Sequence, residues 1–279
     1  MKLRGLKLSL RIKPVTKHHA ILILGQKKAG TTSLYAAIAA TGLPVIDIPK
    51  ESGVMNSPAL LRRTLRQAGP EAILLDATTT YFESGAFSPE FIQNLAQFDS
   101  VTVLFICREE TDRLASHFRH SLNHDGWRGP ASKFVGSGDY LHHARLSPVV
   151  SAVKELGIDD IHVLPFSLLK DPERLVQVVG MIVGKKPDME NVAAENTFGS
   201  LQVMPRPVQK FLATSFFQLV LRPLIPSKLR TSMKQAIGSK NVDVEMTELD
   251  QPQIQAIAEG IMAENAKLLK TYGASRLNQ

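Results

Sequence analysis

Lysine, glycine and hydroxyl side chains follow one another in residues 25–34, in the order Gly-Gln-Lys-Lys-Ala-Gly-Thr-Thr-Ser-Leu. An apolar run precedes this segment and a pattern of small residues follows it, so we expect a strand, a glycine turn and a helix. A helix that begins directly after such a turn presents unpaired backbone N–H groups and the positive end of its dipole. With Lys28 beside them, these groups predict an anion-binding site.

The two glycines of this loop have the spacing of the nucleotide-triphosphate P-loop, in which a lysine directly follows the second glycine. Here Thr31 occupies that position, and the lysine has moved to Lys28. The spacing alone leaves open a second interpretation, a turn chosen for tight packing of a strand against a helix. Lys28 and the hydroxyls at the helix start favour the anion site.

Residues 28–34, Lys-Ala-Gly-Thr-Thr-Ser-Leu, resemble the Lys-x-Gly-Thr-Thr-x-Leu loop of sulfotransferases that use 3′-phosphoadenosine-5′-phosphosulfate (PAPS). The resemblance implies that the loop holds the 5′-phosphosulfate of PAPS and that Lys28 stabilises the departing phosphate. The donor-binding residues that it implies in this loop are Lys28, Ala29, Gly30, Thr31, Thr32 and Ser33.

A second segment, Arg-Glu-Glu-Thr-Asp-Arg-Leu-Ala-Ser at 108–116, resembles the 3′-phosphate site of the same family. That site has an arginine at a strand end and a serine eight residues later on the next helix, and Arg108 and Ser116 fit this spacing. Arginine offers a planar fork of donors to phosphate oxygens, and serine adds a hydroxyl. Arg113 also fits the pattern, whereas Glu110 replaces a frequent proline. We expect Glu109 and Glu110 to face solvent.

A lysine and a glutamate, Lys50 and Glu51, follow the second predicted strand. Glycan-directed sulfotransferases carry a Lys-Glu pair in this loop, with the glutamate as the base. The resemblance implies that Glu51 takes the proton of the acceptor hydroxyl and that Lys50 contacts the sulfonate oxygens. A histidine is the base in many small-molecule members of the family, which leaves three alternatives open: His117, His120 and His124.

The third region, 73–82, resembles a Glu-Lys-Ser-Pro-x-Tyr-Phe segment of the family, with Ala77 in place of the lysine. It also supports a rival interpretation, because Asp76 at the end of an apolar run could hold magnesium in a P-loop kinase that uses ATP. The position of Thr31 argues against the kinase. A third alternative is a nucleotide- or glycan-binding module that has kept the loop and lost the base.

The reaction implied by the resemblance is an in-line transfer of sulfonate from PAPS to a hydroxyl, which yields adenosine 3′,5′-bisphosphate and requires no metal. A glutamate base and a long glycine-rich loop at 123–139 favour a carbohydrate acceptor, a polysaccharide or a glycolipid. Trp127 and Arg128 lie in that loop. The tryptophan could stack on a sugar ring or simply anchor the loop.

The elements that must position these residues alternate along the first two thirds of the chain. This alternation predicts an α/β fold, a three-layer sandwich with a central parallel sheet and a P-loop-like phosphate-binding loop, plus a helical C-terminal tail. The expected strands are 20–24, 44–48, 72–76, 101–107 and 161–166. The expected helices are 31–40, 58–67, 89–96, 111–122, 140–156, 172–183 and 251–270.

Composition and charge narrow the possible partners. The formal charge of +7 suits an anionic ligand, whereas 6% aromatic residues and scattered cations argue against nucleic acid. The lone Cys107 excludes an intramolecular disulfide framework, so a cytoplasmic location is expected. No apolar run has the roughly 20 residues of a spanning helix. The amphipathic segment 211–225 leaves peripheral membrane contact as an alternative to a core helix.

One main domain is expected. Residues 1–17 carry six basic residues and no continuous apolar stretch of the kind found in a signal peptide. We expect a basic segment at 1–17 and one sulfotransferase domain at 18–279. Within that domain, 18–184 form the α/β core and 185–279 a mostly helical part. Oligomeric state is not predicted.

Overall fold

The computed structural model describes residues 18–40, 43–69, 71–82, 85–125, 127, 129–184 and 246–273 of the chain. The basic segment 1–17 and the amphipathic segment 211–225 lie outside these residues, so the domain division and the membrane contact stay predictions. Within the described ranges, no helix is both long and apolar enough to cross a bilayer.

Four parallel strands form one sheet in the order β2-β1-β3-β4. Their bounds are β1 (His19–Ile23), β2 (Ile73–Asp76), β3 (Ser100–Cys107) and β4 (Ile161–Pro165). After β1 the chain adds β2 on one side, and it then crosses to the other side to add β3. Ligands of open α/β sheets bind at such a switch, beyond the carboxyl ends of the strands. The loops that follow β1 and β3 carry Lys28 and Arg108, so the topology brings both predicted phosphate sites to one place.

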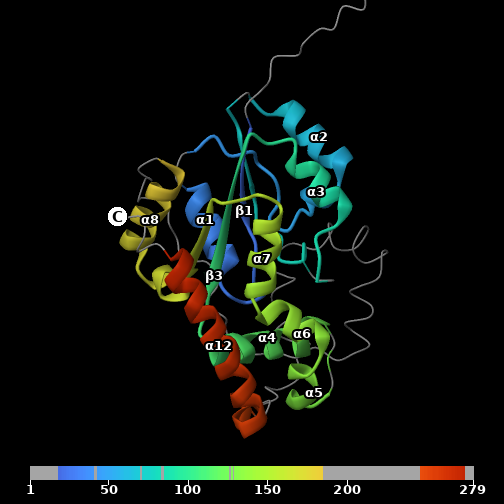
Figure 1. Cartoon of the computed structure of the whole chain (residues 1–279), viewed down its shortest axis with the longest axis vertical. Helices are drawn as coiled ribbons and strands as arrows, with labels where there is room; N and C mark the ends of the chain where they lie inside the picture. The colour runs from blue at the N-terminus through green and yellow to red at the C-terminus, as the bar shows by residue number, and fades with distance from the viewer. Residues whose placement is uncertain are drawn as a thin grey trace, which may run out of the picture.

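Helices cover both faces of the sheet, which confirms the predicted three-layer α/β class (Figure 1). Helices α1 (Thr31–Ala39) and α8 (Pro172–Val183) pack on one face, and α2 (Pro58–Gln67), α3 (Pro89–Leu95) and α7 (Ser147–Glu155) pack on the other. Strand β1 is buried on both sides: Ala20 and Leu22 join one apolar cluster, and Ile21 and Ile23 join the other. This double burial explains its unbroken apolar sequence.

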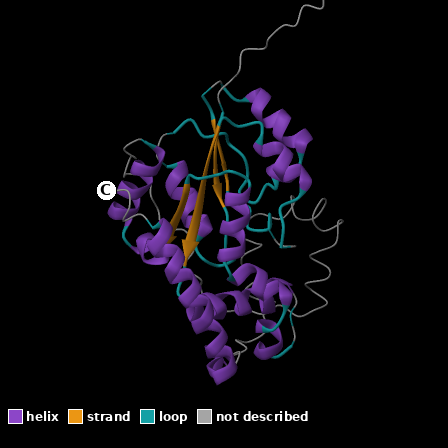
Figure 2. Cartoon of the chain, viewed as in Figure 1, coloured by secondary structure: helices purple, strands orange, loops and turns teal. Residues whose placement is uncertain are grey.

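A group of helices lies beyond the carboxyl ends of the strands (Figures 1 and 2). Its apolar cluster joins α4 (Glu110–His120), α5 (Ala131–Val135), α6 (Gly138–Ala144) and α12 (Pro252–Tyr272) with the short helix Met246–Asp250. Three further short helices, Val54–Asn56, Ser121–Asp125 and Phe166–Lys170, lie in the connections. The described residues between 110 and 144 therefore form a separate helical layer over the strand ends.

Three predicted helix starts are confirmed in atomic detail. The side chains of Ser57, Ser88 and Asp171 each accept a hydrogen bond from a first-turn N–H, and a proline follows each of them. A capping oxygen satisfies a backbone donor that has no partner within the helix, and proline suits the first helical position because it lacks that donor.

Three predicted elements were wrong in extent. The segment 44–48 is no full strand; it makes one isolated bridge, from Val45 to Ile73, because Pro44 at its start and Pro49 directly after it lack the N–H that a ladder needs. The helix expected at 140–156 is two helices, since Pro148 cannot donate to the preceding turn. The loop expected at 123–139 contains the short helix α5.

Candidate functional site

The loop between β1 and α1 has an unusual backbone. Gly25 and Gly30 have φ values of 139° and 97°, and Lys28 has a left-handed φ of 67°. A Cβ atom added to Gly30 would lie 2.4 Å from Leu169 Cδ1 and 3.0 Å from Phe166 Cε2. Glycine is therefore required here both for its conformation and for its lack of a side chain.

Helix α1 begins with Thr31, Thr32 and Ser33, and its first turn contains no acidic residue. The residue before it, Gly30, supplies no side-chain cap. The helix start combines backbone donors, hydroxyl groups and the positive end of the dipole, without a carboxylate to oppose an incoming anion. This arrangement agrees with the predicted phosphate loop.

Arg108 follows β3 and reaches directly to this loop. Its Nη1 donates to the carbonyl oxygen of Lys28 at 3.1 Å, and its guanidinium lies 4.6 Å from the centre of the Phe166 ring. Its Nε is buried and has no hydrogen-bond partner, and its Nη2 lies 3.9 Å from Asp112 Oδ2. One of the two predicted phosphate sites is thus bonded to the other.

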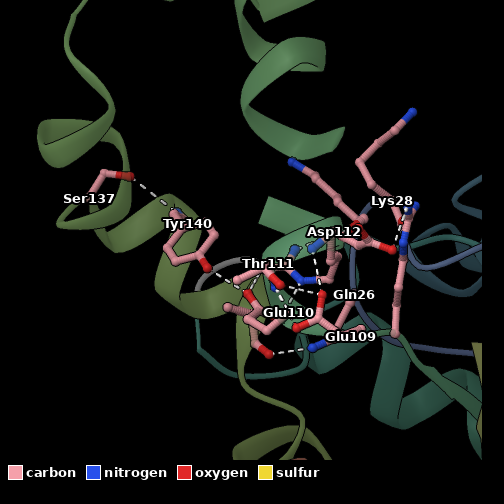
Figure 3. A network of polar contacts seen from close by, with 12 residues as sticks. Gln26, Lys28, Glu109, Glu110, Thr111, Asp112, Ser137 and Tyr140 are labelled. Atoms are coloured by element: carbon pink, nitrogen blue, oxygen red, sulfur yellow. Dashed lines mark hydrogen bonds and ion pairs between the residues drawn. The ribbon is translucent and has the colours of Figure 1, made fainter. Parts of the chain in front are cut away.

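Arg113, one turn further along α4, holds the neighbouring carbonyl group. Its fully buried side chain donates from Nη1 to the carbonyl oxygen of Lys27 at 3.1 Å. Its Nε and Nη2 donate to Glu110 at 2.8 and 2.5 Å. The hydroxyl of Tyr140 also donates to Glu110, at 2.5 Å (Figure 3). Two arginines of one strand–helix unit therefore bind successive carbonyls of the phosphate loop.

The expectation that Glu110 faces solvent was wrong. Its side chain is fully buried, because a buried guanidinium requires a counterion within hydrogen-bonding distance. Glu109 is exposed, as expected, and caps α4 by accepting hydrogen bonds from the N–H groups of Thr111 and Asp112. The sequence signal for the buried pair was its i,i+3 spacing on a helix, which brings the two side chains together.

Lys50 and Glu51 form an ion pair, with Nζ 2.6 Å from Oε1. The lysine side chain is 22% exposed and that of the glutamate 56%, so the carboxylate is accessible to a ligand. Glu51 has a φ of 60°, in the left-handed region that non-glycine residues rarely adopt.

Three predicted site residues act on the charge of a fourth, Lys28. Burial lowers the pKa of Lys28, the positive charges of Lys50 and Arg108 lower it further, and the carboxylate of Glu51 opposes them. These residues come from three loops, after β1, before α2 and after β3. The fold therefore brings Lys50, Glu51 and Arg108 within electrostatic reach of Lys28.

His117, an alternative base, is fully buried in the helical layer. Its ring lies 5.2 Å from that of Phe134 and 6.1 Å from those of Tyr140 and His143, and neither ring nitrogen has a hydrogen-bond partner. Burial, aided by the charge of Arg113, lowers its pKa to about 2. It is a fully buried, neutral packing residue of the helical layer. His120 is half-buried on the same helix, and the side chain of His124 lies outside the described part of the chain.

Asp76 does not match the geometry of a magnesium ligand. Its carboxylate is buried and accepts hydrogen bonds from three hydroxyl groups, those of Tyr81, of Thr78 at 3.0 Å and of Ser52 at 3.4 Å. Among the described residues, no group of three or more His, Cys, Asp or Glu side chains could hold a metal ion. The hydroxyls of its own chain already occupy the oxygens that a kinase would need.

Three other residues singled out in the sequence, Trp127, Cys107 and Ser116, are not part of the charged cluster around Lys28. Trp127 donates from Nε1 to the carbonyl of Gly129 at 2.7 Å and packs edge-on against Phe134, so it anchors its own loop. Burial raises the pKa of the Cys107 thiol to about 11, which excludes an activated nucleophile. Ser116 is half-buried on α4, the helix that follows Arg108.

No protein family model matches the chain, and no curated protein matches it in sequence. Similar solved structures include a sulfotransferase from Alicyclobacillus acidocaldarius, with 17% identity, a TM-score of 0.47, and coverage of 75% of this chain and 98% of that chain. The sulfotransferase domain of the Synechococcus PCC 7002 olefin synthase has 11% identity, a TM-score of 0.47, and coverage of 88% and 95%. Retinol dehydratase in a complex with retinol and PAP has 12% identity, a TM-score of 0.40, and coverage of 89% and 81%. All three TM-scores are below 0.5.

Proposed function

We propose that this chain is a PAPS-dependent sulfotransferase, which transfers sulfonate from PAPS to a hydroxyl group of an acceptor. One observation carries the proposal. Lys28 and Glu51 are the two non-glycine residues of the described chain with a left-handed backbone, and each lies in the electrostatic field of the other. Such a conformation costs roughly 1–3 kcal/mol, persists only where the surrounding structure determines it, and is concentrated at functional sites. The family motifs in the sequence predict catalytic roles for the same two residues.

The donor would lie along the switch between β1 and β3. The start of α1 and its hydroxyls would bind the 5′-phosphate, through Gly30, Thr31, Thr32 and Ser33 with Ala29 beside them. Arg108 and Ser116 would bind the 3′-phosphate. Arg108 suits this role because its buried Nε has no partner of its own, and a phosphate oxygen would satisfy it.

The chemistry follows from the four clustered charges. Glu51 takes the proton of the acceptor hydroxyl, and that oxygen forms a bond to sulfur while the bond from sulfur to the bridging phosphate oxygen breaks. Lys28 stabilises the charge on the departing oxygen, and its lowered pKa makes it a better hydrogen-bond donor there. Lys50, held at 2.6 Å from Glu51, neutralises the sulfonate oxygens. The products are a sulfate ester and adenosine 3′,5′-bisphosphate.

We propose a carbohydrate as the acceptor class, on the ground of the Lys50–Glu51 pair that glycan-directed members of the family carry. Trp127 gives no separate support to this class, because its half-buried ring already serves as an anchor, donating to the carbonyl of Gly129 and packing against Phe134. Hydrophobic alcohols are the competing class. A screen of saccharides and sterol or retinoid alcohols with radiolabelled PAPS would decide between them by the class that accepts label.

Thermal unfolding with and without ligands tests the proposed donor. Adenosine 3′,5′-bisphosphate without magnesium should raise the melting temperature, since a ligand at 100 times its Kd stabilises the native state by about 2.7 kcal/mol. ATP with magnesium should have a much smaller effect. A rise with ATP and magnesium but none with the bisphosphate would favour the kinase and overturn the proposal.

A further inference from the structure

Three successive backbone amides after Glu51 are bound by three hydroxyl groups. The N–H of Gly53 donates to Thr78 Oγ1 at 3.2 Å, and that of Val54 donates to Ser52 Oγ at 3.2 Å. The N–H of Met55 donates to the Tyr81 hydroxyl at 3.0 Å. Each of these hydroxyls has its own proton left to donate.

All three hydroxyls donate that proton to the same carboxylate, Asp76. Thr78 and Ser52 donate to Oδ1 at 3.0 and 3.4 Å, and Tyr81 donates to Oδ2 through a short hydrogen bond. An ionised carboxylate can only accept, so it fixes each hydroxyl with its lone pairs toward the amides. One buried group at the end of β2 thereby organises the whole turn at 53–55.

The turn also has anchors on the other side. Asn94 of α3 donates from Nδ2 to the carbonyl of Met55 at 3.0 Å, and Ser88 donates to the side chain of Asn56 at 2.9 Å. Glu51 precedes this fixed turn and has a left-handed φ of 60°. A strained residue keeps such a conformation only where its surroundings determine it. The hydroxyl groups around Asp76 fix the backbone on the C-terminal side of Glu51, and they thereby help to hold Glu51 in its left-handed conformation.

We propose that Asp76 is a positioning residue for Glu51. Through Ser52, Thr78 and Tyr81 it holds the turn at 53–55, which keeps the Glu51 carboxylate beside Lys50 and in the field of Lys28. This inference rests on the proposed function, because it assigns Asp76 a role toward the base of that reaction. The acid at this position thus acts through backbone amides, without contact to donor or acceptor.

Hydrogen exchange in the Tyr81→Phe variant tests the link without any assay of activity. Phenylalanine keeps the ring packed on Phe91, 5.0 Å away, and removes only the hydroxyl between Met55 and Asp76. Exchange of the amides at 53–55 should accelerate at least tenfold, with exchange in α1 unchanged. Tyr272→Phe, at the end of α12, is the matched control and should leave the turn unaffected.

The effect of Tyr81→Phe on turnover, measured in the wild type and in a Glu51→Gln variant, distinguishes a role in positioning Glu51 from a general loss of stability. With radiolabelled PAPS and the acceptor found in the screen above, Tyr81→Phe should lower kcat at least tenfold and leave the KM for PAPS unchanged. In a Glu51→Gln background it should cause no further loss, because the residue that it positions is already gone. If Tyr81→Phe does not fold, Ser52→Ala breaks the Val54 link at a half-buried position and serves in its place.

Unchanged exchange at 53–55, or an equal loss of turnover in both backgrounds, would overturn the inference about Asp76 and leave the proposed function intact. The proposed function fails by a different result. If the wild-type chain neither binds adenosine 3′,5′-bisphosphate nor transfers sulfonate, Glu51 is not the base of a sulfonate transfer. The positioning role of Asp76 toward that base is then wrong as well.

Discussion

Lys28 and Glu51 share a left-handed backbone, with φ values of 67° and 60°, although 23 residues separate them in the chain. The carboxylate of one raises the pKa of the other, against burial and two neighbouring cations that lower it. Two charged residues that interact therefore both have a rare backbone conformation. The loops that carry Lys28 and Glu51 are where the fold accommodates backbone strain.

Glu51→Gln should lower the rate of sulfonate transfer by roughly 10²–10⁴-fold, to a small but measurable residual rate, while leaving the affinity for adenosine 3′,5′-bisphosphate nearly unchanged. Glutamine keeps the size of the side chain but cannot take a proton, and the proposed bisphosphate contacts lie elsewhere, at the start of α1, Lys28, Arg108 and Ser116. Titration calorimetry and a radiolabel assay give the two numbers. Turnover equal to that of the wild type would remove Glu51 from the role of base and turn attention to His120 or His124.

Lys28→Met should weaken bisphosphate binding by about tenfold or more, an effect of roughly 1.5–3 kcal/mol for a lost charge-assisted hydrogen bond. Lys27→Met is the matched control. The two lysines are adjacent, but the charge of Lys27 acts on buried His117, whereas Lys28 interacts with Lys50 and Glu51. Equal losses in both variants would show that only the total charge of the loop matters.

Glu51→Gly should make the protein more stable and inactive. Glycine adopts a φ of 60° without steric cost, so the variant should gain on the order of 1 kcal/mol in the free energy of unfolding, less the entropy of a more flexible unfolded chain. Glu259→Gly in the exposed face of α12 should instead lose about 1 kcal/mol. Denaturant unfolding compares them, and a destabilised Glu51→Gly would argue against strain at this position.

His117 should make the fold sensitive to acid. Its pKa falls from 6.5 to about 2 in the native state because of burial, so below pH 6.5 the unfolded chain binds a proton that the native chain does not. Stability should therefore be fully present above pH 6.5 and fall by about 2 kcal/mol by pH 5 from this group alone. His117→Phe should reduce the difference in unfolding free energy between pH 7.5 and pH 5. An unchanged difference would assign the acid sensitivity to other groups.

Arg113→Met should destabilise the fold by about 3–5 kcal/mol, because it leaves the Glu110 carboxylate buried without a counterion. Adding Glu110→Gln should recover part of that stability. Donor affinity should stay reduced in the double variant, since the carbonyl of Lys27 has still lost its donor. Recovery of both properties would confine Arg113 to a structural role.

The sequence predicted the features that depend on local patterns. Four of the five expected strands and the capped starts of α2, α3 and α8 form because apolar runs, serine or aspartate caps and prolines act within a few residues. The segment 44–48 is apolar enough for a strand, but the prolines beside it limit its backbone pairing. A prediction from apolar runs alone is wrong at this segment because a proline has no backbone N–H to donate to a neighbouring strand.

The sequence could not predict features that depend on distant contacts. Glu110 stands in a charged segment and looks solvated, yet Arg113 and Tyr140 draw it into the core. The role of Asp76 depends on hydroxyls from residues on both sides of it in the chain, Ser52 and Tyr81. A left-handed φ at Lys28 or Glu51 is set by such contacts too, because lysine and glutamate have no local preference for it.

The two arginines that hold the carbonyls of Lys27 and Lys28 also set the direction of the N–H groups that follow, since a trans peptide points its N–H opposite its C=O. The loop thus has its shape before any donor binds. The conformational entropy of the loop is lost when the chain folds, and little more is lost when the donor binds. Binding of a phosphorylated nucleotide should then proceed without a slow rearrangement of the loop, and its association rate should be limited mainly by diffusion and charge.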